Sequence, residues 1–139
     1  MGFKFEKLDV WVAALGYLDL IYTIAESLPK SEDYNLKSQI IRAGTSITLN
    51  IAEGSTGQTD AEQVRFLGMA IRSLLETVAC QHIINRRDYV NDKTLLRQAY
   101  KDAQILAAQL QSMRKAITPE QSWLRESPTD YNTESETSF

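Results

Sequence analysis

The sequence predicts an all-α protein, an antiparallel up-down-up-down four-helix bundle. Four stretches place apolar residues at alternating steps of three and four, which is the spacing of one helix face. The connections between them are short, and short connections favour antiparallel neighbours. No stretch alternates apolar and polar residues as a half-buried strand would. With 139 residues, of which 43% are hydrophobic, the chain has the size of one domain with one core.

The first helix is predicted over residues 9–28, with Asp9 as its N-cap and Pro29 as its stop. Two apolar stripes run side by side along it, so we expect it to meet neighbours on two sides. The stripes are Trp11, Leu15, Leu18, Tyr22 and Ala25, and Val10, Tyr17, Ile21, Ile24 and Leu28.

The second helix is predicted over residues 33–53, with Gly54 as its C-terminal cap. A polar edge runs beside its apolar stripe. Buried polar groups need hydrogen-bond partners, so we expect this edge to have a structural role in contacts with other helices. Two of its members, Arg42 and Glu53, lie three turns apart and are expected to pair with other helices. The edge consists of Gln39, Arg42, Ser46, Asn50 and Glu53.

The third helix is predicted to open at the capping box Thr59 to Glu62 and to run to about residue 88. Gly68 lies inside it and costs about 1 kcal/mol relative to alanine. It marks either the close approach of another helix or a tolerated position. Asn91 and Asp92 are expected to cap the fourth helix, which Pro119 ends.

The bundle is therefore predicted to occupy residues 1–118. Residues 119–139 are predicted to be a disordered, acidic tail, in which Trp123 and Leu124 are a possible local anchor. The net charge of −3 hides a strong asymmetry. Residues 1–64 carry a net −4, residues 65–118 a net +5, and the tail a net −4. The tail is therefore able to screen the basic half of the bundle in part.

The basic residues of the third and fourth helices are the candidate nucleic-acid-binding residues. Rows of arginine and lysine on helices bind phosphates through charge, without a sequence code. The alternative is an ordinary solvated outer face, because no aromatic residues interleave with these rows as a stacking platform would need. The candidates are Arg65, Arg72, Arg86, Arg87, Arg97, Lys101, Arg114 and Lys115.

A search for catalytic chemistry is negative, so we expect no enzyme, no metal site and no cofactor. The sequence holds one cysteine, Cys80, and one histidine, His82, which cannot supply a familiar zinc site. Two positions apart on a helix, they diverge by about 200°. Cys80 is interpreted as a core residue and His82 as a polar surface or interface group. The GSTG stretch at residues 54–57 lacks the lysine of a phosphate-binding loop.

No apolar run approaches 18 residues, so no membrane span is predicted. The first residues carry charges and no long apolar region, which argues against a secretory signal. One cysteine allows no internal disulfide. The expected compartment is the cytoplasm.

Several motifs resemble a family of bacterial four-helix-bundle proteins. These are FEKLDVW at residues 5–11, S-Q-I-x-R-A at 38–43, NIAEG at 50–54 and R-F-L-x-x-A-x-x-S-L-x-E at 65–76. The family includes proteins encoded by intervening sequences in large-subunit ribosomal RNA genes. It also includes the accessory variability determinant of diversity-generating retroelements. The resemblance covers about residues 3–117.

The resemblance implies a four-helix bundle assembled into a homopentameric ring. For the retroelement branch it also implies binding of nucleic acid and of a reverse transcriptase. The leading hypothesis is therefore a non-enzymatic oligomeric accessory protein that binds RNA, or an RNA–reverse-transcriptase complex, through the basic faces of the third and fourth helices. The alternative is a structural or protein-interaction scaffold of the intervening-sequence type that binds no nucleic acid.

Overall fold

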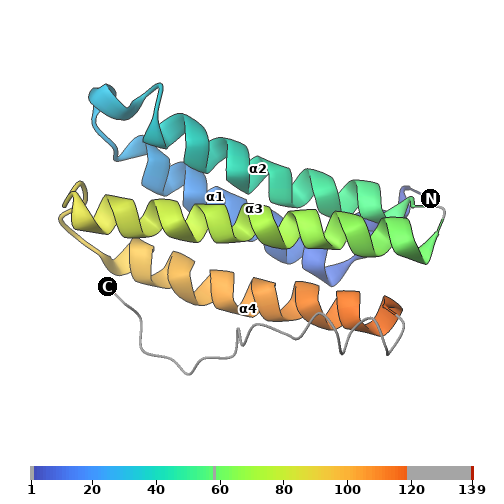
Figure 1. The fold of residues 1–139 in the computed structure, drawn as a ribbon. Helices are drawn as coiled ribbons and strands as arrows, with labels where there is room; N and C mark the ends of the chain where they lie inside the picture. Colours follow the sequence, from blue (N-terminus) through green and yellow to red (C-terminus); the bar gives the residue numbers. More distant parts are fainter. Residues whose placement is uncertain (1, 58, 119–138) are drawn as a thin grey trace.

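The computed structural model describes residues 2–57, 59–118 and 139, and within these ranges it is all-α without strands. Four long helices lie side by side (Figure 1). This confirms the predicted all-α class and the four predicted helices within the described ranges. The helices are α1 (Asp9–Glu26), α2 (Leu36–Ser55), α3 (Asp60–Arg86) and α4 (Thr94–Ile117), with short 3-10 helices η1 (Lys4–Lys7) and η2 (Lys30–Glu32).

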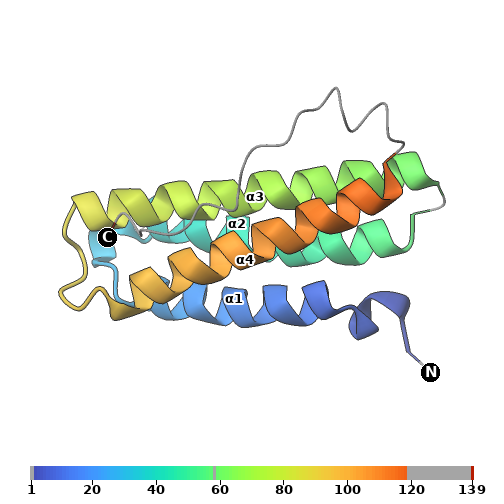
Figure 2. The same ribbon diagram turned by 90° about the horizontal axis from the view of Figure 1, so that it is seen from below.

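The core lies between the four long helices, and each helix packs mainly against two others. The contacts pair α1 with α2, α2 with α3, α3 with α4, and α4 with α1. Seen from below, α4 lies between α1 and α3 (Figure 2). Each helix sends one apolar stripe inward, represented by the fully buried Ile21, Ile40, Ile84 and Leu110. The predicted boundary at residue 118 stays a prediction, because residues 119–138 lie outside the described part.

Only one of the two apolar stripes predicted on α1 is fully buried. Val10, Tyr17, Ile21, Ile24 and Leu28 all lie in the core. In the other stripe, which is Trp11, Leu15, Leu18, Tyr22 and Ala25, only Ala25 is buried and two side chains, Leu15 and Tyr22, are exposed. The expectation that α1 meets neighbours on two sides is confirmed, because it packs against both α2 and α4, although its second stripe is only partly covered. The helix also starts at Asp9 rather than after it, and ends at Glu26, two residues before the predicted end.

The second helix begins at Leu36, three residues later than predicted, because η2 forms before it. The Glu32 carboxylate accepts hydrogen bonds from the Asn35 side chain (2.9 Å) and from the Leu36 backbone N–H (3.3 Å). Its other oxygen accepts from the Tyr89 hydroxyl at 2.7 Å. These hydrogen bonds lower the pKa of the Glu32 carboxyl group, and the bond from Tyr89 has the largest effect. Glu32 thus ties the start of α2 to the segment between α3 and α4.

The prediction that Gly54 caps α2 is wrong, because the helix continues to Ser55 and Thr56 is the C-cap residue. Gly54 is buried inside the last turn. A Cβ atom built on it would lie 3.0 Å from the Cβ of Phe66 on α3. The glycine is therefore required for the close approach of α3 to the end of α2, rather than for a left-handed cap.

The predicted cap of α3 is confirmed at Thr59, whereas the N-cap residue of α4 is Lys93, one position after the predicted Asn91 and Asp92. The Thr59 hydroxyl accepts a hydrogen bond from the Glu62 backbone N–H at 3.1 Å. Asp92 Oδ1 accepts from the Thr94 backbone N–H (2.9 Å) and from its hydroxyl (2.6 Å), and these bonds lower the pKa of Asp92. However, α3 ends at Arg86, before the predicted residue 88. The chain turns at Asp88, whose φ of 58° is left-handed.

A buried polar network joins α1 to α3 inside the core. The Thr77 hydroxyl donates its proton to the Leu74 carbonyl at 2.6 Å. It therefore accepts a hydrogen bond from the Tyr17 hydroxyl, which lies 2.7 Å away. Gln81 Nε2 in turn donates to the Tyr17 hydroxyl at 2.7 Å. All three network residues, Tyr17, Thr77 and Gln81, are at most 2% exposed. Burial raises the pKa of Tyr17 well above its ordinary value. The network fixes the position of α1 relative to α3.

Replacement by alanine should change stability in opposite directions at Gly54 of α2 and at Gly68 of α3. In Gly68→Ala the new Cβ would meet only the Arg114 guanidinium at 3.8 Å, an ordinary contact. This change should raise the free energy of unfolding by about 1 kcal/mol, the gain in helix propensity. In Gly54→Ala the contact with Phe66 forces a backbone shift, so a net loss of about 1 kcal/mol is expected. Urea unfolding of both variants tests this, and stabilisation by Gly54→Ala would contradict it.

Removal of the Tyr17 hydroxyl should destabilise the bundle. Tyr17→Phe leaves the buried Gln81 amide without its acceptor, which costs about 2 kcal/mol. Tyr22→Phe is the matched control, because Tyr22 lies on the same helix and is 43% exposed. Urea unfolding should show a clear loss for the first variant and almost none for the second. Equal effects of the two changes would mean that the network contributes nothing to stability.

Candidate nucleic-acid interface

Three of the candidate bases form a row along the outer face of α3. Arg65, Arg72 and Arg86 are exposed, and their spacings of seven and fourteen residues keep them on one side of the helix. The Arg65 guanidinium lies 4.7 Å from the centre of the Phe66 ring, and this contact holds its charge on the surface. Arg87 follows as the C-cap residue, 5.8 Å from the centre of the Tyr89 ring. A hydrogen bond to Tyr89 raises the pKa of Arg87.

The candidate bases of α4 divide into exposed and half-buried side chains. Arg97 and Lys101 are four residues apart on an exposed side of the helix, and Lys115 is exposed near its end. Arg114 is half-buried, because its guanidinium packs over Gly68 of α3. Of the two interpretations of Gly68, the structure favours the tolerated position, because a Cβ there would meet the Arg114 side chain only at 3.8 Å. Arg114 lies in the α3–α4 seam, whereas the other α4 bases face outward.

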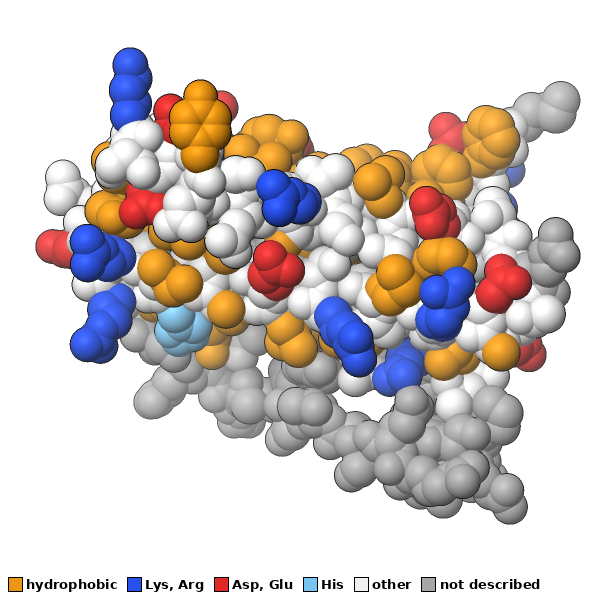
Figure 3. Space-filling view, turned by 45° about the horizontal axis from the view of Figure 1, so that its top comes forward, with side chains coloured by type: hydrophobic (Ala, Val, Ile, Leu, Met, Phe, Trp, Pro, Cys, Tyr) orange, Lys and Arg blue, Asp and Glu red, His pale blue; other side chains and the backbone are white. Residues whose placement is uncertain are grey.

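Much of this positive charge is not neutralised within the fold. Arg72, Arg86 and Lys101 form no ion pair with any residue in the ranges 2–57, 59–118 and 139. Figure 3 views the molecule from the side of α2 and α3, and it shows Lys and Arg side chains interspersed with hydrophobic, neutral and acidic ones. Unpaired exposed bases can contact phosphates without first breaking an internal ion pair. We name the exposed bases of the two helices the α3–α4 basic surface: Arg65, Arg72, Arg86, Arg87, Arg97, Lys101 and Lys115.

The predicted polar edge of α2 forms its hydrogen bonds mostly within α2. Asn50 is buried, and its amide donates to the Ser46 carbonyl (2.8 Å) and hydroxyl (3.0 Å). The Ser46 hydroxyl also accepts from Ser73 of α3 at 2.9 Å, so Asn50 reaches α3 through Ser46. Gln39 is exposed and donates to Asn35 at 3.5 Å. The expected structural link between helices is thus present at Ser46.

The cross-helix pairs expected for Arg42 and Glu53 do not form in the described part of the chain. Arg42 is exposed and donates to the Ser38 hydroxyl of its own helix at 3.2 Å. Glu53 is exposed, and its side chain has no hydrogen bond to another described helix. The periodicity placed both residues beside the apolar stripe correctly. It could not show that Arg42 and Glu53 face outward while Asn50 of the same edge is buried.

The residues with catalytic potential are not arranged as a reactive site. Cys80 is buried, and burial raises the pKa of its thiol to about 11, so it is protonated at neutral pH. His82 is exposed and lies beside Tyr100, with a distance of 6.1 Å between ring centres. Among the described residues, no three His, Cys, Asp or Glu side chains gather as a metal site would require. No helix in the described ranges has the length and hydropathy to span a bilayer.

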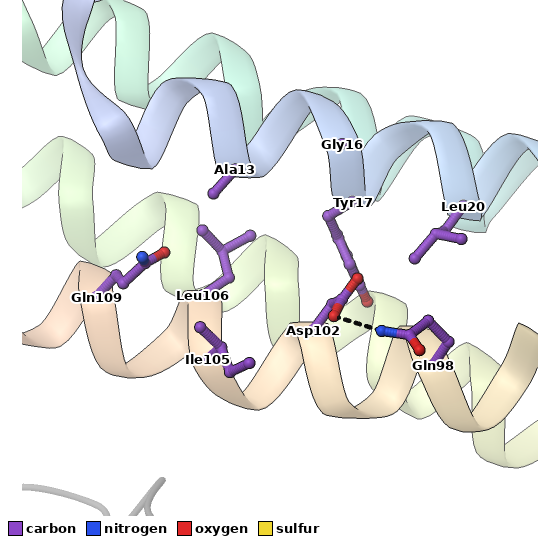
Figure 4. Close-up of a pocket in the computed structure, with 9 residues that line it drawn as sticks. All are labelled: Ala13, Gly16, Tyr17, Leu20, Gln98, Asp102, Ile105, Leu106 and Gln109. Atoms are coloured by element: carbon purple, nitrogen blue, oxygen red, sulfur yellow. Dashed lines mark hydrogen bonds between the residues drawn. The ribbon is translucent and has the colours of Figure 1, made fainter.

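A groove of about 440 Å³ lies between α1 and α4 (Figure 4). Small residues of α1 open it, and a Cβ atom added at Gly16 would meet nothing within 4 Å. Asp102 and Gln98 of α4, joined by a hydrogen bond of 2.9 Å, supply polar groups beside Tyr17. The sequence did not predict this groove, because its lining residues come from distant segments. The lining residues are Ala13, Gly16, Tyr17, Leu20, Gln98, Asp102, Ile105, Leu106 and Gln109.

The described residues thus define a helical-bundle protein with a basic outer surface on two of its helices. The chain belongs to the 23S rRNA-intervening sequence protein family, whose family model matches residues 6–112. This confirms the resemblance to the intervening-sequence proteins. It carries no information on a retroelement.

A solved structure shares the fold. It is the crystal structure of a protein of unknown function from the S23 ribosomal protein family of Bacteroides thetaiotaomicron. The TM-score is 0.70 at 24% sequence identity, over 76% of this chain and 98% of that chain. At this identity the similarity shows the fold alone. The comparison with curated proteins gives no match.

Proposed function

We propose that this protein is a non-enzymatic, cytoplasmic RNA-binding protein that works as a homo-oligomer. The single observation that carries the proposal is the α3–α4 basic surface, whose bases are exposed and in part without ion pairs in the described ranges. The net charge of +5 over residues 65–118 gives this surface an attractive field for a polyanion. The family description refers to intervening sequences of 23S rRNA, and this favours RNA as the polyanion that the surface binds.

The surface would bind RNA mainly through its phosphates. Arginine and lysine side chains on an outer helix face reach phosphate oxygens and release condensed counterions. Such contacts position the protein and carry no base code, so recognition would depend on RNA shape. In the proposed antiparallel bundle, the rows of Arg65 and Arg72 on α3 and of Arg97 and Lys101 on α4 run along neighbouring helices. A folded RNA could then contact both rows at once.

The proposed homo-oligomer, a pentameric ring by the family resemblance, would use a different part of the surface. On α1 the exposed apolar side chains Val12 (60% exposed) and Leu15 (39% exposed) have no partner within the bundle that would bury them. The groove beside α4 adds the exposed Ile105. Contiguous exposed apolar side chains of this kind mark protein–protein contacts. The same face supports the alternative function, a protein scaffold that binds no nucleic acid.

The family match favours the intervening-sequence branch of the resemblance. Association with a reverse transcriptase, as in diversity-generating retroelements, stays a prediction of the resemblance and rests on no feature of the described residues. RNA binding is the property that separates the leading proposal from the scaffold. It is therefore the property to test first.

Charge reversal on α3 should weaken RNA binding strongly. The double variant Arg65→Glu/Arg72→Glu replaces two phosphate contacts by repulsion, so we expect affinity to fall by at least about tenfold at low salt. Fluorescence anisotropy with a labelled, structured RNA measures this. The control is Lys37→Glu, a charge reversal on α2 next to Asp33, which should leave affinity nearly unchanged.

Two outcomes would contradict the proposal. If the wild-type protein binds no structured RNA at low salt, the scaffold function replaces RNA binding. If both charge-reversed proteins lose affinity equally, the binding depends on overall charge and not on the α3–α4 basic surface.

A further inference from the structure

Phe139 lies against side chains of α3 and α4 that are distant from it in the sequence. Its ring centre is 4.9 Å from that of His82 on α3 and 5.3 Å from that of Tyr100 on α4. Arg97 Nε donates a hydrogen bond to the backbone oxygen of Phe139 at 3.0 Å. The Phe139 side chain is half-buried and packs against the hydrophobic core. Two helices therefore contribute to one contact with this residue.

The three residues around Phe139 have the chemistry of a binding site for an aromatic residue in a peptide segment. Tyr100 meets the Phe139 ring at 81°, the edge-to-face geometry that aromatic pairs prefer. His82 and Tyr100 also meet edge to face, at 82°. Arg97 supplies a charged donor for a backbone oxygen, and bonds with a charged donor are about twice as strong as neutral ones. An apolar ring and a peptide oxygen are thus recognised together.

We propose that His82, Tyr100 and Arg97 form a binding site for a peptide segment with an aromatic side chain, and that Phe139 of the same chain occupies it. The length of the chain permits this contact. Thr118 follows the end of α4, whereas Arg97 lies near its start, about 32 Å away at 1.5 Å per residue. The twenty residues from 119 to 138 could span about 65 Å when extended.

Occupancy of this site has a consequence for RNA binding, and this step rests on the proposed function. Arg97 belongs to the α3–α4 basic surface, and its Nε–H group donates a hydrogen bond to the backbone oxygen of Phe139. While Arg97 Nε is bonded to Phe139, this donor is not available to a phosphate oxygen. Phe139 therefore competes with RNA for the same surface.

The contact can be tested without RNA, because the sequence has one histidine. His82 gives the only imidazole Hε1 signal in proton NMR, and an aromatic ring whose centre is 4.9 Å away shifts that signal. In the full-length protein, Phe139→Ala should move the signal, whereas Phe139→Tyr should keep it near its wild-type position. Phe3→Ala is the control, because Phe3 is 69% exposed and stacks on Phe5 instead. Circular dichroism checks that all variants are equally helical.

An unchanged His82 signal in Phe139→Ala would overturn the proposed site. A dilution series of the wild-type protein tests whether the contact is made within one chain. A signal that moves on dilution toward its position in Phe139→Ala would assign the bound Phe139 to a second copy. That result would overturn occupancy by the same chain.

A second experiment measures the competition. Phe139→Ala should bind a structured RNA about tenfold more tightly than the wild type, because a charge-assisted hydrogen bond no longer occupies Arg97. Equal affinities of the two proteins would overturn the competition. If neither protein binds RNA, the proposed function fails, while the NMR result still decides whether Phe139 occupies the site.

Discussion

The structure depends on the burial of α3, which is the longest of the described helices and contacts three others. It packs against α2 and α4 on its two sides, and Thr77 and Gln81 bind the Tyr17 hydroxyl of α1. These contacts hold α3 in its orientation against α1, because the Gln81 amide nitrogen and the Thr77 hydroxyl both bond to the buried Tyr17 hydroxyl. One strip of α3 is left outward, and Arg65, Arg72 and Arg86 lie on it. The position of the basic surface is thus a consequence of core packing.

Periodicity was sufficient to predict the helices, because each buries a single stripe whose spacing appears directly in the sequence. Local cap chemistry was equally readable at Thr59 and Asp92. The role of Gly54 was predicted wrongly. In the sequence, a glycine that caps a helix end cannot be distinguished from one that makes room for a neighbouring helix, here at Phe66. The contacts of Tyr17 with Gln81, 64 residues away, could not be predicted, because no local pattern joins them.

The candidate site was predictable in composition but not in detail. The sequence identified the bases of α3 and α4, while only the structure separates the outward Arg72 and Lys101 from Arg114 in the helix seam. His82 was expected to be a surface or interface group, and its contact with Phe139 gives that expectation a specific partner. The exposed apolar side chains of α1 lie on a different helix from the basic surface, whereas Ile105 lies four residues after Lys101 on α4.

The central claim is that the α3–α4 basic surface binds RNA phosphates. Its most direct test is the affinity of the full-length protein for a structured RNA, measured by fluorescence anisotropy over a series of salt concentrations. Contacts with about four phosphates predict that the logarithm of the association constant falls linearly with the logarithm of salt concentration, with a slope of about −3. A slope near zero, or no binding at the lowest salt concentration, would contradict the claim.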